Sequence, residues 1–456
     1  MKHRSWDRSG EIGHERSVMR KTTPVKALFQ PAAGGPTLLA HCRSLALGAL
    51  ILTVLACFPA GGAAQGVPPE QLYSEGTAFL ERGNWAEAAS RFEAVLEVEP
   101  DHIPSWFSLA VALEGSGDGP RAIEAYREVL ARDDQLFEAR MNLAILLHQA
   151  GDAAGALEQA SHGALLRPGD PVPVLYGAEL LDQLGQIEEA EQAYRAVIAL
   201  DSRLPAPHRR LGSLYRRTGR ADAAYDAFLE AARLGAGESS VFVSLGDIAV
   251  EQERFAAARD HYRMALGLEP DDPEIGMRLA LVFHELGAYS EAIAILTGLG
   301  NQEPVLAETY LAAGRFDEAA NLYEALVASE PGNVDYWLGL GRAYYELGRL
   351  PEAIRTLERA VGMAPDHAEA WAMLAGSYYQ QDDFENAAAM LLKRLELLPD
   401  DAHSHFLLAT ALDRMQNAEQ ALLHYNRFLE LDDGTDDVRT FQVRQRAELL
   451  ERLLDE

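Results

Sequence analysis

The stretch VDYWLGLGRAYYELGRLPEAIRTLERAVGMAPDH, residues 334 to 367, decides the fold of this chain. Gly341 and Ala353 stand at positions 8 and 20 of this 34-residue unit, and large apolar residues occupy positions 7, 11 and 24. Small residues at two such positions let a pair of helices approach closely, while apolar residues spaced i, i+4 give each helix one buried stripe. The stretch therefore predicts a helical hairpin.

The same pattern recurs in eleven units from residue 69 to residue 435. Position 8 holds Gly76, Ala110, Ala144, Ala178, Gly212, Gly246, Ala280, Ala307, Gly341, Ala375 and Ala409. One hairpin cannot bury its own apolar stripe, so the hairpins must stack. Glycine at position 15 ends the first helix in eight units. The other three have Glu253, Asp382 and Gln416 there, which are expected to shift the turn without abolishing the hairpin.

The unit length and pattern resemble those of the tetratricopeptide repeat family. The resemblance implies an all-α fold, a right-handed superhelical solenoid of about eleven helical hairpins with a C-terminal capping helix. In that family the first helix of each hairpin lines a concave groove, and positions 2, 5, 9, 12 and 13 tend to face it. This implies a binding solenoid and no catalytic domain.

The expected organisation has five parts: an N-terminal basic region and signal peptide at 1–64, repeats 1–6 at 65–272, a shortened repeat 7 at 273–299, repeats 8–11 at 300–435 and a capping helix at 436–456. Seven residues are missing at repeat 7, or at the start of the next unit, where Pro304 would open a shortened helix. A bend or hinge is expected there, because the stacking surface is reduced.

The C-terminal segment has apolar residues at roughly helical spacing. They are Val438, Phe441, Ala447, Leu450, Leu453 and Leu454. Terminal repeats of a solenoid need a cover for their apolar face, so this segment is predicted to be a helix that covers repeat 11. A disordered charged tail is the alternative.

The net charge of -30 at pH 7 is unevenly distributed. Residues 1–44 carry eight Lys/Arg and three Asp/Glu, and the acidic excess lies in the remainder. Such an excess repels nucleic acid, so nucleic-acid binding is not expected. Lys393 is the only lysine after residue 26, which is typical of a GC-rich bacterial genome. The true start could be Met1 or Met19.

An apolar run of 14 residues, Leu45–Phe58, precedes the repeats. It is shorter than the roughly 20 residues of a membrane span and suits a signal-peptide core, with cleavage predicted after Ala64. Two alternatives are lipidation of Cys57 and an uncleaved N-terminal anchor, and these are the only expected contacts with a membrane. In each case the repeats would be exported, periplasmic or envelope-associated.

No motif for catalysis or for a cofactor is present. The chain has no P-loop, no dinucleotide-binding glycine motif, no nucleophile elbow and no HExxH motif. Its two cysteines precede the repeats. The nearby histidines His403 and His405 point to different sides of a helix, with His424 on the next one, which is poor geometry for a metal. We therefore expect no enzyme activity, cofactor or metal.

Three sets of residues are candidate groove contacts. The first is an apolar track formed by Tyr73, Phe107, Met141 and Leu175 at position 5, with Val111 and Ile145 at position 9. If it is exposed, the track suits an extended peptide or an amphipathic helix. Packing between repeats is the rival interpretation.

The second set is a basic island in repeat 5 that includes Arg209, Arg216 and Arg217. It is either a receptor for a carboxylate of a partner or a set of ion pairs with neighbouring repeats. The expected pairing residues are Glu179, Asp182, Asp247 and Glu251.

The third set groups Arg342 and Tyr345 with Tyr379 in repeats 9 and 10, where aromatic and guanidinium faces could hold a peptide or a sugar. The Lys and Asn carboxylate clamp of some family members is absent, since the repeats contain one lysine.

Together these features predict a scaffold or adaptor of the bacterial cell envelope that binds other proteins or peptide segments. The alternative is a non-catalytic, substrate-binding subunit of a glycosyltransferase, polysaccharide-export or peptidoglycan-modifying complex.

Overall fold

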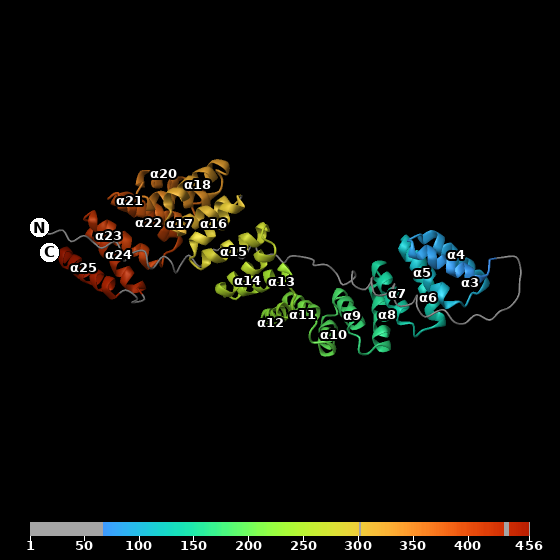
Figure 1. Ribbon diagram of the computed structural model, residues 1–456. Coiled ribbons are helices and arrows are strands. Elements are labelled where there is room, and N and C mark those ends of the chain that lie inside the picture. The colour runs from blue at the N-terminus through green and yellow to red at the C-terminus, as the bar shows by residue number, and fades with distance from the viewer. Residues whose placement is uncertain (1–66, 301, 433–436, 456) are drawn as a thin grey trace. The chain divides into compact units, whose positions relative to one another are not determined.

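The computed structural model describes residues 67–300, 302–432 and 437–455, which form 23 α-helices and no strand (Figure 1). The prediction of an all-α array of helical hairpins is confirmed. None of the helices in these residues is both long and apolar enough to cross a membrane. The predicted signal peptide, its cleavage site at Ala64 and the lipidation site at Cys57 lie outside the described residues.

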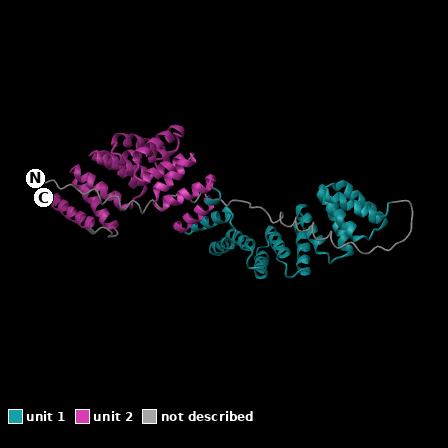
Figure 2. Ribbon diagram, in the orientation of Figure 1, with its two compact units in different colours: residues 1–253, 267–269 teal, residues 254–266, 270–456 magenta. Residues whose placement is uncertain are grey.

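The described residues divide into two compact units: those up to 253 together with 267–269, and 254–266 together with those from 270 onwards (Figure 2). The first contains the helices α3 (Pro69–Glu81), α4 (Trp85–Val98), α5 (Ile103–Ser116), α6 (Gly119–Arg132), α7 (Phe137–Gln149), α8 (Ala153–Leu166), α9 (Pro171–Gln183), α10 (Ile187–Leu200), α11 (Pro205–Arg217), α12 (Ala221–Arg233) and α13 (Ser239–Glu251).

The second unit contains most of α14 (Phe255–Leu268), then α15 (Pro273–Glu285), α16 (Tyr289–Leu299), α17 (Glu303–Ala312), α18 (Phe316–Ser329), α19 (Val334–Glu346), α20 (Leu350–Met363), α21 (Ala368–Gln380), α22 (Phe384–Leu397), α23 (Ala402–Arg414), α24 (Ala418–Leu431) and α25 (Asp437–Asp455). The division falls between the two helices of repeat 6, whereas the sequence placed its hinge at repeat 7.

Most hairpins are held by a large side chain of the second helix that packs on a small residue of the first. A Cβ atom at Gly212 would lie 2.8 Å from the ring of Phe228, and one at Gly341 would lie 2.6 Å from Leu357. Contacts this short require one partner to move. Position 8 therefore holds only Gly or Ala because the side chain at position 24 fills the space that a larger side chain at position 8 would need.

The turn within each hairpin needs a residue in the left-handed conformation. The glycines at position 15 have positive φ, for example 73° at Gly219. Glu253, Asp382 and Gln416 adopt the same conformation, with φ of 57°, 61° and 62°. The expectation of a shifted turn is wrong, because hairpin packing holds these residues in a conformation that costs roughly 1–2 kcal/mol without glycine.

Successive repeats interlock through position 24 of one unit and position 6 of the next. Tyr126 accepts a hydrogen bond from the side-chain amide of Asn142 at 2.9 Å. Repeat 3 reverses the sizes: Ala160 replaces the usual large residue at position 24, and Tyr176 stands at position 6 of repeat 4. Tyr176 is 6% exposed and belongs to the same core cluster as Ala160, so the aromatic ring is supplied from the opposite side.

Repeat 7 keeps its hairpin despite the missing residues. Its first helix α15 has 13 residues, but α16 has 11 and α17 has 10, so the deletion shortens the helices on both sides of the junction. The helix α16 contacts both α15 and α17 within the second unit. The predicted hinge at this place stays a prediction.

The C-terminal helix α25 packs on α24, as expected of a cap. Ala447 and Leu450 are buried against repeat 11, joined by Val443. The prediction is wrong for four other residues, Val438, Phe441, Leu453 and Leu454, which are 42% exposed or more. They fail to reach repeat 11 because the helix turns only one face towards it.

Candidate functional site

The first helices of the hairpins form a shared surface within each unit. In the first unit α3 contacts α5, and α9 contacts α11. In the second unit α19 contacts both α17 and α21. A partner that lies across these helices would therefore touch several repeats at once, which is how a solenoid gains binding area.

The predicted apolar track is largely buried. Phe107, Met141, Ile145 and Leu175 are 5%, 8%, 8% and 4% exposed. Phe107 packs edge-to-face on the ring of Tyr126, with centroids 5.6 Å apart. The interpretation as an open groove is therefore wrong at these four positions, because large side chains here fill the space between repeats.

The other two members of the track are partly buried and pack against the same core cluster. Tyr73 contacts the rings of Phe92 and His102, at centroid distances of 5.6 and 5.4 Å. Val111 also packs on this cluster. Of the two interpretations left open by the sequence, burial favours packing between repeats.

The basic island pairs with acidic residues of the preceding repeat. The Arg210 guanidinium on α11 lies 2.8 Å from the Glu179 carboxylate on α9. Arg217 forms an ion pair with Asp182, also on α9. Both carboxylates are more than four-fifths buried. These pairs join two successive first helices, at residues expected from the spacing.

Two other arginines of the basic island, Arg209 and Arg216, form ion pairs with acidic residues of repeat 6. Arg216 lies 3.0 Å from Asp247 on α13, whose side chain is 2% exposed, and 3.9 Å from Glu251. Arg209 lies 3.1 Å from Glu238, which precedes α13. A buried carboxylate without a cation is strongly unfavourable, so Arg216 stabilises the fold. The geometry favours ion pairing over a receptor for a partner's carboxylate.

The patch in repeats 9 and 10 is more open. Arg342 and Tyr345 on α19 and Tyr379 on α21 are all half-buried. Tyr345 reaches α21, where its hydroxyl accepts a hydrogen bond from Gln380 at 2.5 Å. Its ring lies 3.7 Å from the place of a Cβ at Gly376, so a larger residue there would cover it. The structure thus brings two repeats together around Tyr345.

Acidic groups flank this patch on the side of repeat 8. Withdrawal from water raises the pKa of Glu308 on α17, and Asp335 raises it further, whereas the Arg342 guanidinium opposes the shift. Tyr379 packs edge-to-face on Phe384, with centroids 5.2 Å apart. The patch therefore combines one cation, two aromatic rings and a carboxyl group of altered proton affinity.

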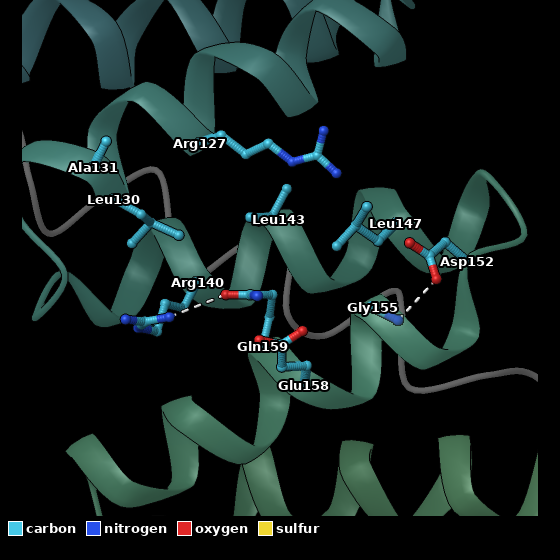
Figure 3. A pocket seen from close by; sticks show the side chains of 10 residues that line it. All are labelled: Arg127, Leu130, Ala131, Arg140, Leu143, Leu147, Asp152, Gly155, Glu158 and Gln159. Atoms are coloured by element: carbon cyan, nitrogen blue, oxygen red, sulfur yellow. Dashed lines mark hydrogen bonds between the residues drawn. The ribbon is translucent and has the colours of Figure 1, made fainter.

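The sequence did not predict a hollow of about 450 Å³ between α6, α7 and α8 (Figure 3). Leu130, Leu143 and Leu147 line it, with Arg127 and Glu158 among its charged residues. Figure 3 shows Arg127 extending beside Leu143. The feature of the sequence that could have indicated this hollow is α8, AAGALEQASHGALL, in which most side chains are small.

The histidine cluster has a structural explanation. The Nε2 atom of His405 lies 3.0 Å from the carbonyl oxygen of Pro399, and its Nδ1 lies 2.9 Å from Nδ1 of His424. Trp371 makes the matching bond to Pro365 one repeat earlier. His405 therefore replaces a structural tryptophan. No group of three potential metal-ligating side chains occurs in the described ranges.

Several curated proteins resemble parts of this chain. Protein O-mannosyl-transferase TMTC1 of Homo sapiens is 27% identical over 182 residues, 39% of this chain and 20% of its own length. Cellulose synthase 1 operon protein C of Komagataeibacter xylinus is 26% identical over 263 residues, 56% of this chain and 17% of its own length. The chain thus spans a fifth or less of these relatives.

Solved structures with the same kind of repeat are similar only loosely. The APC/C hetero-tetramer Cut9-Hcn1 has a TM-score of 0.39 at 14% identity and covers 84% of this chain and 96% of its own. YrrB, described as a TPR protein with an unusual peptide-binding site, has a TM-score of 0.31 at 21% identity and covers 47% and 96%. At these TM-scores neither likeness says what this chain binds.

Models of the tetratricopeptide repeat match most of the repeat array. One matches residues 73–136, 107–171, 177–239 and 243–299, and a second matches 310–376 and 348–409. These ranges cover more than half of the chain and coincide with hairpins in both units. The chain therefore belongs to the tetratricopeptide repeat family.

Proposed function

We propose that this protein is a non-catalytic scaffold of the bacterial cell envelope that holds a peptide segment or a helix of a partner protein. Membership of the family and the shared surface of first helices support a protein-interaction role. The envelope location rests on the apolar run Leu45–Phe58 and the small residues that follow it.

The binding surface is the patch of Arg342, Tyr345 and Tyr379. The observation that carries this assignment is the contrast between the two units. In the first unit Phe107, Met141 and Leu175 at position 5 are buried, and Arg216 at position 12 forms an ion pair with Asp247. In repeats 9 and 10 Gly376 carries no side chain over the Tyr345 ring, and both tyrosines are half-buried. Tyrosine and arginine are the residues that most often dominate binding energy at interfaces.

The test is affinity isolation from envelope extracts, with partners identified by mass spectrometry. The double variant Tyr345→Ala and Tyr379→Ala is expected to lose the partners retained by the native protein while keeping its melting temperature within a few degrees. Tyr225→Ala is the matched control, because Tyr225 is a half-buried tyrosine on the second helix α12. Retention of every partner by the double variant would place the binding surface elsewhere.

A substrate-binding subunit of a polysaccharide-handling complex is the second candidate. The half-buried rings of Tyr345 and Tyr379 could stack on sugar rings, and one relative is named for a cellulose synthase operon. Isothermal titration with gluco-oligosaccharides tests it. Heat of binding that disappears in the double tyrosine variant supports this role, and no heat with the native protein at millimolar sugar rejects it for that class of sugar.

A further inference from the structure

The helix α25 has two apolar faces. One packs on repeat 11 through Val443, Ala447 and Leu450, which are 2–4% exposed. Arg446 fixes the helix further, because its guanidinium makes two hydrogen bonds to the Asp413 carboxylate at 2.6 and 2.7 Å. The position of α25 on repeat 11 is thus well determined, and its opposite face points away from the hairpins.

This opposite face, named here the outer stripe, consists of Val438, Phe441, Leu449 and Leu453. Their exposed fractions are 67%, 63%, 40% and 54%. At 100° per residue they fall within one third of the helix circumference, a sector that also contains the exposed polar residues Gln442, Gln445 and Arg452. The outer face of a solenoid cap is normally polar, which keeps the array soluble. An apolar stripe on this helix therefore points to a partner.

The outer stripe is complementary to itself. Phe441 lies four residues before Gln445 and Leu449 lies four residues after it. Val438 and Leu453 are seven and eight residues away on either side. When two copies pair antiparallel about Gln445, Phe441 of each copy therefore meets Leu449 of the other. This is the arrangement that a two-fold symmetric interface requires, in which residue i contacts j and j contacts i.

Charges beside the outer stripe are compatible with a second copy as the partner. Arg444 and Glu448 flank it on one side, so the antiparallel register places Arg444 of one copy next to Glu448 of the other, twice. The residues of α25 include four arginines and four acidic residues, so this helix is neutral in a chain of net charge -30. Two such chains repel each other least at a neutral surface.

We propose that α25 is a homodimerisation helix, whose outer stripe pairs antiparallel with the same stripe of a second copy. The dimer doubles the number of partner-binding patches on one particle, so a ligand with two binding segments can be held with an avidity that exceeds either single affinity. The inference stands independently of the proposed binding patch, because it depends only on α25.

Analytical ultracentrifugation between 1 and 100 µM tests the proposal. A species of twice the monomer mass is expected for the native chain. The variant Phe441→Glu with Leu449→Glu is expected to weaken dimerisation at least tenfold with an unchanged circular dichroism spectrum, because both side chains are exposed. Leu423→Glu on α24 is the matched control, since Leu423 is 61% exposed and outside the outer stripe.

Two further variants test the register. Arg444→Glu and Glu448→Arg are each expected to weaken the dimer, and the double exchange is expected to restore it. In a chain with Cys42→Ser and Cys57→Ser, Gln445→Cys is expected to form an intermolecular disulfide. A monomeric native chain at 100 µM, or a dimer that survives Phe441→Glu with Leu449→Glu, would overturn the proposal.

Discussion

Removal of the Arg216 guanidinium is expected to destabilise the first unit strongly and locally. Its partner Asp247 is 2% exposed and lies 3.0 Å away, whereas Glu251 is farther and half-exposed. Arg216→Met keeps most of the apolar stem but removes the guanidinium that lies 3.0 Å from the buried Asp247 carboxylate. Breaking a buried pair in this way costs about 3–5 kcal/mol. The loss should appear in α11 and α13, which the pair joins.

Hydrogen exchange followed by mass spectrometry measures this effect helix by helix. Each 1.4 kcal/mol changes an equilibrium tenfold, so amides in α13 should exchange about a hundredfold faster or more in Arg216→Met. Asp247→Asn in the same chain removes the negative charge of the buried side chain and should restore most of the protection. A local readout is needed because solenoids unfold in parts.

Arg217→Met is the matched control on the same helix. Asp182 is 14% exposed but the Arg217 side chain is 54% exposed, so water reaches this pair from the arginine side and screens it. Exposed pairs contribute about 0–1 kcal/mol, which predicts at most a few-fold change in exchange. Equal losses of protection in the two variants would refute the argument that burial of Asp247 decides the magnitude. Unchanged exchange in Arg216→Met would show that the ion pair does not stabilise the repeats.

Four other outcomes are expected. Gln416→Gly should raise the free energy of unfolding by about 1 kcal/mol in urea titration, because relief of the left-handed strain at φ 62° exceeds the entropy that glycine adds to the unfolded chain. Burial lowers the pKa of His284 below its ordinary 6.5, so the unfolded chain takes up the proton first. Neutral His284 therefore does not lower the free energy of unfolding above pH 6.5, and stability is lost as the pH falls towards the folded pKa. The variant His284→Gln should make the free energy of unfolding, measured by urea titration, depend less on pH between pH 5 and 7. Mass spectrometry of the exported protein should find Gln65 at the N-terminus, and a lipidated or intact terminus would contradict the predicted cleavage. Hydrogen exchange across 293–306 should be faster than in the flanking repeats if repeat 7 is a hinge, and equal exchange rates would contradict the hinge hypothesis.

The sequence by itself determined the hairpins, their number and their internal packing. Columns of small and large residues such as Gly212 and Phe228 carry this information, because each pair lies within one 34-residue unit and must fit. The ion pairs of Arg216 and Arg217 were also predictable, since equivalent positions in successive first helices become neighbours.

Only the tertiary structure decided which faces are covered. Helical spacing shows that Phe107 and Phe441 each belong to an apolar stripe, but it does not show what lies against that stripe. Phe107 is 5% exposed because neighbouring helices enclose it, whereas Phe441 is 63% exposed because it lies on the face of α25 that turns away from repeat 11. Burial depends on the stacking of neighbours, and that stacking is a property of the array as a whole.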